Sequence, residues 1–318
     1  MQAIRISHHG GVEALSLEEI PPPTNTPVDH LRLRVDIAGV NFIDVYHRRG
    51  QYPLPMTEEV GSGIGIEGIG TAPNGERVFW LSALGSYAQE INLVTKDVTA
   101  LPKTKLANEE VLPLLCQGLT AHYLVDSAFK VEEGQWALVT AAAGGVGLLL
   151  TQLLKIRGAN VIALASTAER ATLAKEHGAD VVGTYSEIEN LTSNATVGAG
   201  VNVVFDSVGK DYFDICLSSL TNSGMYVLYG AASGPVPPFD LMRLNSKSLA
   251  IRRPTLATYT ATEAERVRRL SELISLTEEG YLRYPRTKVF SMTEVQSAHR
   301  LIESRTHTGK IGIDPWKI

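Results

Sequence analysis

One glycine-rich turn constrains the fold of this chain more than any other feature. The turn reads Ala141-Ala-Ala-Gly-Gly-Val-Gly147 and directly follows Trp136-Ala-Leu-Val-Thr140, a run typical of a buried strand. The apolar residues after it recur at helical spacing, which predicts a helix from Gly145 to Arg157. A strand, a tight turn and a helix in this order open a βαβ unit.

The glycines of this turn have the spacing of a dinucleotide site. Aligned with the pattern G-x-G-x-x-G, the three positions are Ala142, Gly144 and Gly147. The second glycine lets the backbone approach a pyrophosphate, and the third permits close contact between helix and strand. Free N–H groups at the helix start favour an anion. We therefore predict cofactor contacts from Ala143, Gly144, Gly145, Val146 and Gly147; a tight turn without a ligand is the alternative.

The end of the next strand distinguishes the two nicotinamide cofactors. An NAD site has Asp or Glu there to bind the ribose 2′-hydroxyl, but this chain has Leu164-Ala-Ser-Thr-Ala-Glu-Arg170. Ser166 and Thr167 can donate hydrogen bonds to a 2′-phosphate, and the guanidinium of Arg170 matches its geometry. This composition predicts NADPH. The competing interpretation makes Arg170 a solvated helix residue.

The turn lies within a longer alternation of strands and helices. After a predicted helix from Ala168 to His177, further strands are expected at Val201–Asp206 and Met225–Gly230. Such alternation is typical of a doubly wound parallel sheet. The first hundred residues are instead β-rich, with alternating runs such as Leu31–Ile37, which suggests a small barrel or sandwich.

The regions that flank the alternating segment contain their own helix signals. A helix is predicted from Glu109 to Val125. After Pro254, Thr262 with Glu265 and Thr293 with Gln296 have the spacing of capping boxes that open two further helices. The second of these is expected to end near Ser304, and a short strand follows at Lys310-Ile-Gly-Ile313.

Composition excludes several classes of protein. The 318 residues suit about two domains, and 29 basic against 34 acidic side chains give a net charge of −5, which does not attract nucleic acid. Cys116 and Cys216 are too few for a disulfide framework or a four-cysteine zinc lobe. The first residues lack the apolar segment of a signal peptide, and the most apolar stretch is too short to span a bilayer. We expect a cytoplasmic protein that does not insert into membranes.

Several motifs together resemble one family, the zinc-independent quinone oxidoreductases (zeta-crystallin-like) of the medium-chain dehydrogenase/reductase superfamily. Besides the glycine-rich turn, the motifs are Gly39-Val-Asn-Phe-Ile-Asp44, Tyr46, Gly50-Gln-Tyr-Pro53, Gly118-Leu-Thr-Ala121, Asp206-Ser-Val-Gly209, Ser233-Gly234 and Glu303-Ser-Arg305. The resemblance covers essentially the whole chain. Gln117 departs from it, because a lysine often precedes the Gly-Leu-Thr run.

The resemblance implies an α/β fold with two domains. Residues 1–115 and 257–318 are expected to form a GroES-like β-rich catalytic domain from both termini. Residues 116–256 are expected to form the Rossmann NADPH-binding domain between them. The resemblance also implies a homodimer in which the edge strands of two Rossmann sheets pair around Ser248-Leu-Ala-Ile251.

The residues present at the superfamily's zinc positions argue against a metal. Zinc alcohol dehydrogenases of the superfamily bind the ion through a cysteine where this chain has Asn41, and through a histidine where it has Ile66. An amide and an aliphatic side chain do not replace a thiolate and an imidazole as zinc ligands. A zinc alcohol dehydrogenase is therefore disfavoured, and no metal site is predicted.

The resemblance also implies roles for individual residues. Asn41, Tyr46, Tyr52 and Arg253 are candidates for the catalytic end of the site. By the same resemblance, further cofactor contacts are expected from Tyr185, Ser233 and Gly234. Ser207 and Gly209 are added because they follow the carboxyl end of a predicted strand, where ligands gather in open α/β sheets. The implied activity is NADPH-dependent reduction of a quinone by hydride transfer. Two alternatives stay open: an NADPH-dependent enone or 2-alkenal reductase, and a nucleotide-binding protein without turnover that serves as a crystallin or binds RNA.

Overall fold

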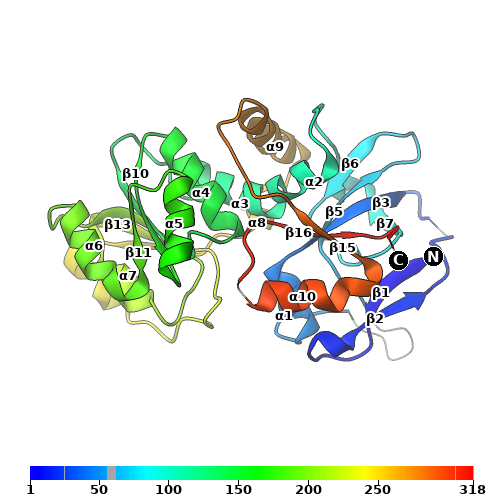
Figure 1. Cartoon of the computed structure of the whole chain (residues 1–318), viewed down its shortest axis with the longest axis horizontal. Helices are drawn as coiled ribbons and strands as arrows, with labels where there is room; N and C mark the ends of the chain where they lie inside the picture. Colours follow the sequence, from blue (N-terminus) through cyan, green and yellow to red (C-terminus); the bar gives the residue numbers. More distant parts are fainter. Residues whose placement is uncertain (25, 56–61, 305, 318) are drawn as a thin grey trace. The chain divides into compact units, whose positions relative to one another are not determined.

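Contacts within the computed structural model divide the chain into two units (Figure 1). The structure describes residues 1–24, 26–55, 62–304 and 306–317. The first unit contains Met1–Cys116, Ala261–Ser275 and Pro285–Ile318, and the second contains Gln117–Thr260 and Leu276–Tyr284. Arg305, the last residue of the Glu303-Ser-Arg305 motif, lies outside the described residues.

The second unit is built on a six-stranded sheet with the order β11-β10-β9-β12-β13-β14, in which neighbouring strands are all parallel. The strands are β9 (Trp136–Val139), β10 (Asn160–Ala165), β11 (Val181–Thr184), β12 (Val201–Asp206), β13 (Leu220–Leu228) and β14 (Ala250–Arg252). The helices of this part of the chain are α3 (Cys116–Tyr123), α4 (Gly145–Ile156), α5 (Ala168–Glu176), α6 (Ile188–Ala195), α7 (Phe213–Ser218) and α8 (Leu256–Tyr259). The predicted doubly wound parallel sheet is confirmed.

The chain changes direction across this sheet at β9. From β9 it proceeds to β10 and β11 on one side, and it then continues with β12, β13 and β14 on the other. Ligands of open α/β sheets bind outside the carboxyl ends of the strands at such a reversal. The fold therefore places the glycine-rich turn, which follows β9, at the expected position for a ligand.

The first unit contains a seven-stranded mixed sheet and a three-stranded antiparallel sheet. The larger sheet has the order β15-β16-β3-β5-β6-β8, with β7 also pairing with β3, and the smaller one has the order β2-β1-β4. The strands are β1 (Gln2–Ile6), β2 (Leu15–Glu19), β3 (His30–Val40), β4 (Ser62–Gly63), β5 (Glu67–Thr71), β6 (Arg77–Trp80), β7 (Glu90–Val94), β8 (Val98–Ala100), β15 (Lys288–Ser291) and β16 (Ile311–Asp314). The helices are α1 (Phe42–Arg48), α2 (Asn108–Val111), α9 (Glu263–Glu278) and α10 (Val295–Ser304).

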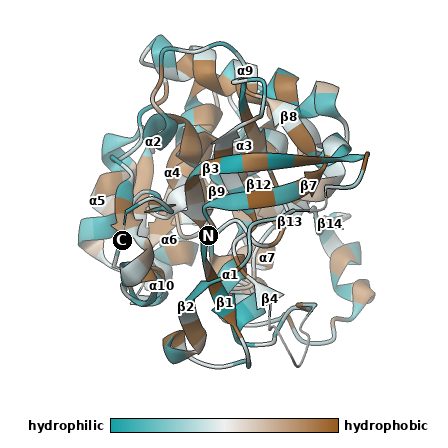
Figure 2. Cartoon of the chain, turned by 90° about the vertical axis from the view of Figure 1, so that its right-hand side faces the viewer, coloured by the Kyte–Doolittle hydropathy of each residue, from teal (hydrophilic) through white to brown (hydrophobic). Residues whose placement is uncertain are grey.

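The alternating pattern of β3 explains how this sheet forms a core. Leu33 and Val35 are buried, whereas the alternating Arg32 and Arg34 are exposed, as the period of a half-buried strand requires. Figure 2 shows this alternation of hydrophilic and hydrophobic residues along β3. The apolar face of the strand joins a core that includes residues of both terminal segments of the chain.

Two local predictions were wrong. The helix predicted from Glu109 to Val125 is broken into α2, a 3₁₀ turn and α3, because Pro113 lacks an N–H and disfavours an uninterrupted helix. Thr293 and Gln296 do not cap α10. Ser291 and Glu294 form the capping box instead, in which the Glu294 carboxylate accepts from the Ser291 N–H at 3.0 Å.

The predicted boundary between the Rossmann domain and the C-terminal part of the catalytic domain also differs from the structure. Residues 257–318 are expected together in the catalytic domain, but residues 257–260 group with the second unit, and so does the segment Leu276–Tyr284. The reason is a pair of hydrogen bonds from α4: the Gln152 side chain donates to the Arg283 carbonyl at 2.9 Å and accepts from the Arg283 N–H at 2.8 Å. The Tyr284 hydroxyl adds a bond to Gln117 at 2.8 Å.

Within the described residues, no helix combines the length and the apolar character that a membrane crossing needs.

Replacing Gln152 with leucine should loosen the 276–284 segment. The Gln152 amide is 7% exposed, and its loss leaves the N–H and carbonyl of Arg283 without their partner. We expect unfolding to become easier by about 1–3 kcal/mol, measured by urea denaturation, with faster amide exchange in this segment. The control is Gln135→Leu, which removes one bond to the Glu132 N–H at the surface. An unchanged amide exchange rate at Arg283 would contradict the role of Gln152 in holding this segment to the second unit.

Candidate functional site

The glycine-rich turn has the tight geometry that its sequence predicts. A Cβ at Gly147 would lie 2.4 Å from the Ala141 carbonyl oxygen and 2.6 Å from the Ala142 Cα, so α4 can approach the turn only with glycine here. Gly144 is the N-cap of α4 and donates to the Ala141 carbonyl at 2.8 Å. The turn thus aims the start of a twelve-residue helix at the edge of the sheet.

The predicted cofactor residues all follow the carboxyl ends of strands in the parallel sheet. Ala143 to Gly147 follow β9, Ser166 and Thr167 follow β10, and Tyr185 follows β11. Ser207 and Gly209 follow β12, and the pair Ser233 and Gly234 follows β13. Since carboxyl ends of parallel strands meet at one edge, the structure gathers these residues along that edge.

A buried carboxylate that the sequence showed only as part of a motif joins three of these strands. Asp206 is fully buried at the end of β12 and accepts hydrogen bonds from the hydroxyls of Thr140 and Tyr226, each at 2.6 Å. It also accepts from the N–H groups of Val208 at 2.8 Å and Gly209 at 2.9 Å. Asp206 therefore fixes the course of the loop that carries Ser207 and Gly209.

Further hydrogen bonds connect the neighbouring loops. The Ser233 hydroxyl donates to the Val208 carbonyl at 2.8 Å, which ties the loop after β13 to the loop after β12. The Tyr185 hydroxyl accepts from the Ala141 N–H at 2.9 Å, and its ring stacks on Tyr212 with centroids 4.1 Å apart. Tyr212 is a residue of this edge that sequence reasoning missed.

Arg170 lies against the glycine-rich turn. It is one helical turn after Thr167, whose hydroxyl caps α5 by accepting from the Arg170 N–H at 3.3 Å. The guanidinium is half-buried and donates to the Ala143 carbonyl at 3.1 Å. Burial lowers the pKa of Arg170, and the group nonetheless keeps its charge because an arginine pKa starts far above neutrality. A fixed positive charge thus borders the turn, and the exposed Ser166 hydroxyl lies at the end of the same strand.

The candidate catalytic residues divide between the two units. Asn41 is the N-cap of α1, Tyr46 lies within α1, and the Tyr52 N–H donates to the Tyr46 carbonyl at 3.3 Å. The rings of Tyr46 and Tyr52 are in contact, with centroids 5.2 Å apart. Arg253 belongs to the second unit, where it donates to the carbonyl of Leu228 at the end of β13.

Sequence reasoning missed a buried ion pair beside Asn41. Lys310 and Glu67 are both fully buried, and the Lys310 ammonium bonds the Glu67 carboxylate directly. Asn41 joins both: its oxygen accepts from Lys310 at 2.9 Å, and its nitrogen donates to Glu67 at 2.7 Å. The only sequence signal for this pair was Lys310 at the start of the predicted strand Lys310–Ile313.

Two further groups lie beside this cluster, the thiol of Cys116 and the buried carboxyl of Asp44. Burial raises the pKa of the Cys116 thiol to about 12, and the nearby Glu67 carboxylate raises it further, so the thiol stays protonated. Burial likewise raises the pKa of Asp44 to about 7, although hydrogen bonds from the Asn41 N–H and the Tyr87 hydroxyl, each at 2.8 Å, oppose the shift. Among the described residues, no three His, Cys, Asp or Glu side chains form a group suited to a metal.

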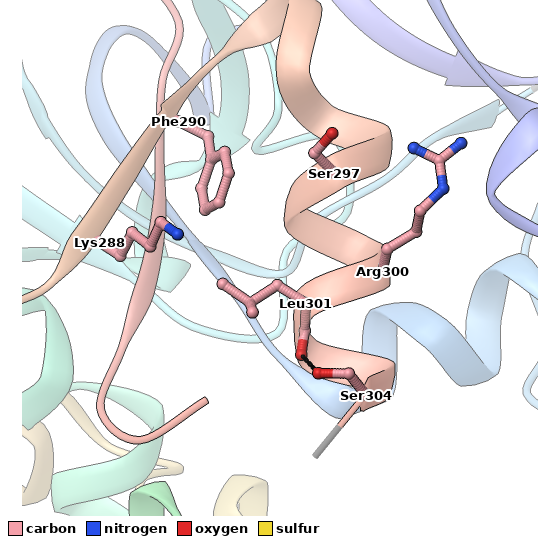
Figure 3. A pocket seen from close by; sticks show the side chains of 6 residues that line it. All are labelled: Lys288, Phe290, Ser297, Arg300, Leu301 and Ser304. Carbon is pink, nitrogen blue, oxygen red and sulfur yellow. Dashed lines mark hydrogen bonds between the residues drawn. The ribbon is translucent and has the colours of Figure 1, made fainter. Parts of the chain in front are cut away.

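A hollow of about 370 Å³ lies on the first unit, between β15 and α10 (Figure 3). It is lined by Lys288, Phe290, Ser297, Arg300, Leu301 and Ser304. It shares no residue with the predicted site.

The titration of Asp44 should make the stability of the protein depend on pH. Its folded-state pKa lies above its ordinary value of 3.8, so the stabilisation from protonated Asp44 is complete below pH 3.8 and disappears as the pH rises through about 7. Asp44→Asn lacks this titration. The free energy of unfolding of Asp44→Asn, minus that of the natural chain, should therefore rise by roughly 3 kcal/mol between pH 5 and pH 8. Urea denaturation at each pH measures this difference. A difference that stays constant with pH would contradict a raised pKa.

Comparison with known proteins agrees with this architecture. Residues 145–275 match the family model described as zinc-binding dehydrogenase. A probable quinone oxidoreductase of Schizosaccharomyces pombe is 34% identical over 97% of this chain and 95% of its own length. A 2-haloacrylate reductase of Burkholderia sp is 32% identical over 99% of both chains. The crystal structure of Escherichia coli quinone oxidoreductase complexed with NADPH has a TM-score of 0.92 and 32% identity, covering 99% of this chain and 100% of that one. The protein is thus a member of the quinone oxidoreductase family in the medium-chain dehydrogenase/reductase superfamily.

Proposed function

We propose that this protein is an NADPH:quinone oxidoreductase that transfers hydride to its acceptor without a metal ion. One observation carries the proposal: at the edge of the parallel sheet, Arg170 lies against the glycine-rich turn and donates a hydrogen bond to its Ala143 carbonyl. The turn supplies N–H groups for a pyrophosphate, and Arg170 supplies charge for a further phosphate. Membership of the quinone oxidoreductase family supports the same activity.

The choice of NADPH over NADH rests on the residues that follow β10. Ser166 and Thr167 are exposed there, and the position holds no carboxylate that would bind a free 2′-hydroxyl. Glu169 is exposed one residue before Arg170. The relative from Escherichia coli was solved with NADPH, which agrees with this choice.

The loops along the sheet edge supply the remaining cofactor contacts in this proposal. Tyr185 offers a flat ring beside the turn, and the backbone of Gly209 adopts a positive φ of 84° that glycine accommodates. A Cβ at Gly209 would lie 2.9 Å from the Gly234 carbonyl oxygen. Ser207 and Ser233 add hydroxyls to the same edge. These residues would hold the nucleotide, which supplies the hydride.

At the acceptor, we propose that Asn41, Tyr46 and Tyr52 provide hydrogen bonds and an aromatic surface. Tyr52 is 41% exposed, so part of its side chain is accessible to a ligand. Arg253 is a further candidate for the acceptor. Quinones need little Lewis-acid assistance because their reduction restores an aromatic ring. The residues present, Asn41 and Ile66, offer poor zinc ligands, which agrees with a reaction that uses no metal.

A second candidate is reduction of an activated carbon–carbon double bond. The similarity to a 2-haloacrylate reductase favours it, because hydride addition to a conjugated acid, enone or enal uses the same cofactor. This candidate shares the NADPH site with the first, and only the acceptor differs.

Oxidation of NADPH, followed by absorbance with each acceptor in turn, separates these functions. We expect turnover with 1,4-benzoquinone or 1,2-naphthoquinone that a chelator does not inhibit. Faster turnover with 2-chloroacrylate or an enal would favour the second candidate. NADPH binding with no turnover across the whole set would contradict both enzymes and favour a binding protein without catalysis.

Arg170→Ala should weaken NADPH binding by about 1.5–3 kcal/mol, since it removes a charged hydrogen-bond donor from the 2′-phosphate. Binding of NADH, which lacks this phosphate, should stay almost unchanged. Isothermal titration of both cofactors measures the difference. Lys175→Met is the matched control, because Lys175 lies on the same helix and donates to the Asp180 carbonyl instead. Equal losses for NADPH and NADH would contradict the proposed role.

We further propose a homodimer in a reducing, cytoplasmic compartment. The strand β14 ends the order of the parallel sheet, and Ile251 on it is 36% exposed. The preceding 3₁₀ segment, η6 (Leu241–Lys247), exposes Leu241 and Met242. An open apolar strand invites pairing with a second copy. Both cysteines are free thiols, which agrees with a reducing compartment.

Light scattering at micromolar concentration tests the dimer. The natural chain should scatter as two copies, and Ile251→Lys should shift the population toward one copy because it places a charge on the pairing edge. The matched control is Val197→Lys, which replaces an apolar residue that is 93% exposed elsewhere on the same unit. A natural chain that scatters as a single copy would contradict the proposal.

A further inference from the structure

The buried pair of Lys310 and Glu67 needs an explanation beyond stability. Both side chains are fully buried, and transferring two charges from water into a protein interior costs about as much as their attraction returns. Replacing a buried ion pair with well-packed apolar residues is often neutral or stabilising. The buried charges of Lys310 and Glu67 are therefore better explained by the group that they bind.

What they hold is the side-chain amide of Asn41. The amide oxygen accepts from the Lys310 ammonium at 2.9 Å, and the amide nitrogen donates to a Glu67 oxygen at 2.7 Å. A cation at one end and an anion at the other leave only one orientation of the amide that satisfies both. The second Glu67 oxygen accepts from the Cys116 N–H at 2.8 Å, which fixes the carboxylate as well.

The backbone around the pair makes room for it. Gly39 on β3 lies opposite Glu67 on β5, and a Cβ at Gly39 would lie 2.1 Å from the Glu67 carboxylate. Lys310 directly precedes β16, which pairs with β3 through Ile311 and Val40. β5 and β16, which both pair with β3, thus place the opposite charges of Glu67 and Lys310 beside Asn41, the residue that follows β3.

One N–H of the Asn41 amide is uncommitted. The amide nitrogen has two N–H groups, and within the described residues its one protein acceptor is Glu67. The ammonium at the amide oxygen draws electron density away from the nitrogen, so the remaining N–H becomes a stronger donor. Asn41 is 6% exposed, which leaves a small part of it accessible.

We propose that Lys310 and Glu67 are positioning residues that orient and polarise Asn41, so that its free N–H donates to the acceptor oxygen on which negative charge collects. The inference rests on the proposed function. In that reaction bound NADPH would supply the hydride that adds to one quinone oxygen, the other quinone oxygen would take up the negative charge, and solvent would supply the proton that completes the hydroquinone. The N–H of Asn41 stays bonded to nitrogen throughout and acts by stabilising the charge.

The test uses a variant in which both charges are removed together. Lys310→Met alone would leave Glu67 buried and unpaired, so the variant examined is Lys310→Met with Glu67→Gln. We expect kcat with 1,4-benzoquinone to fall about 100-fold, as for loss of an oxyanion donor. The dissociation constant for NADPH should stay within about twofold, because the nucleotide site lies in the second unit. A merely structural role would not separate kcat from cofactor binding in this way.

A double-mutant cycle with Asn41→Ala identifies the route of the effect. If the charges act through Asn41, Asn41→Ala alone should lower kcat about as much as the charge removal, and adding it to the charge-free variant should lower kcat little further. Arg266→Met is the control, because it removes another buried cation of the first unit, bonded to Thr99 at 2.6 Å. Its kcat should stay within about twofold of the natural value. A charge-free variant that retains natural kcat, or losses that multiply in the cycle, would overturn the proposal.

A second readout separates this inference from the proposed function. If the natural chain reduces no quinone, the proposed function fails. The positioning role is then tested by ¹⁵N-selective NMR, which measures proton exchange at the side-chain amide of Asn41. An Asn41 amide whose protons exchange slowly in the natural chain and fast in the charge-free variant supports the positioning role. Equal exchange rates in the two proteins overturn it.

Discussion

The nucleotide-binding half of this protein depends on one buried carboxylate. Asp206 accepts hydrogen bonds from two hydroxyls and two backbone N–H groups, and these come from the ends of β9, β12 and β13. A buried charge is tolerated only with such complete hydrogen bonding. The arrangement holds three strand ends in register at the point where the sheet reverses its order, so the glycine-rich turn and the loop through Gly209 keep fixed positions.

The first unit also contains buried charges that are hydrogen-bonded, here as an ion pair. Lys310 and Glu67 are buried beside Asn41 and satisfy one another, and the Glu67 carboxylate also receives the Cys116 N–H. Asp206 and the pair of Lys310 and Glu67 therefore lie next to the residues proposed to meet the ligand. Rigid polar networks of this kind hold side chains in place before the ligand arrives, which is what hydride transfer to a positioned acceptor requires.

Sequence reasoning recovered the features that arise from local patterns. The spacing of glycines located the turn, helical periodicity gave α4 within one residue, and period-two alternation gave the buried face of β3. It missed contacts between distant segments. The bonds of Gln152 to Arg283 and of Lys310 to Asn41 join residues 131 and 269 positions apart, and no local pattern encodes such pairs. Capping also misled, because Thr293 and Ser291 both have an acceptor three residues on, and packing selected Ser291. The roles assigned to the site residues remain predictions.

The proposed preference for NADPH depends most on contacts of Ser166, Thr167 and Arg170 with the 2′-phosphate. Phosphorus NMR of bound NADPH measures that group directly. A free phosphomonoester takes up its second proton near pH 6. A guanidinium and hydroxyls that bind the dianion should hold the 2′-phosphate resonance at its dianionic position down to about pH 5. A bound 2′-phosphate that titrates with the pKa of free NADPH would show that these residues do not contact it, and the central claim would be wrong.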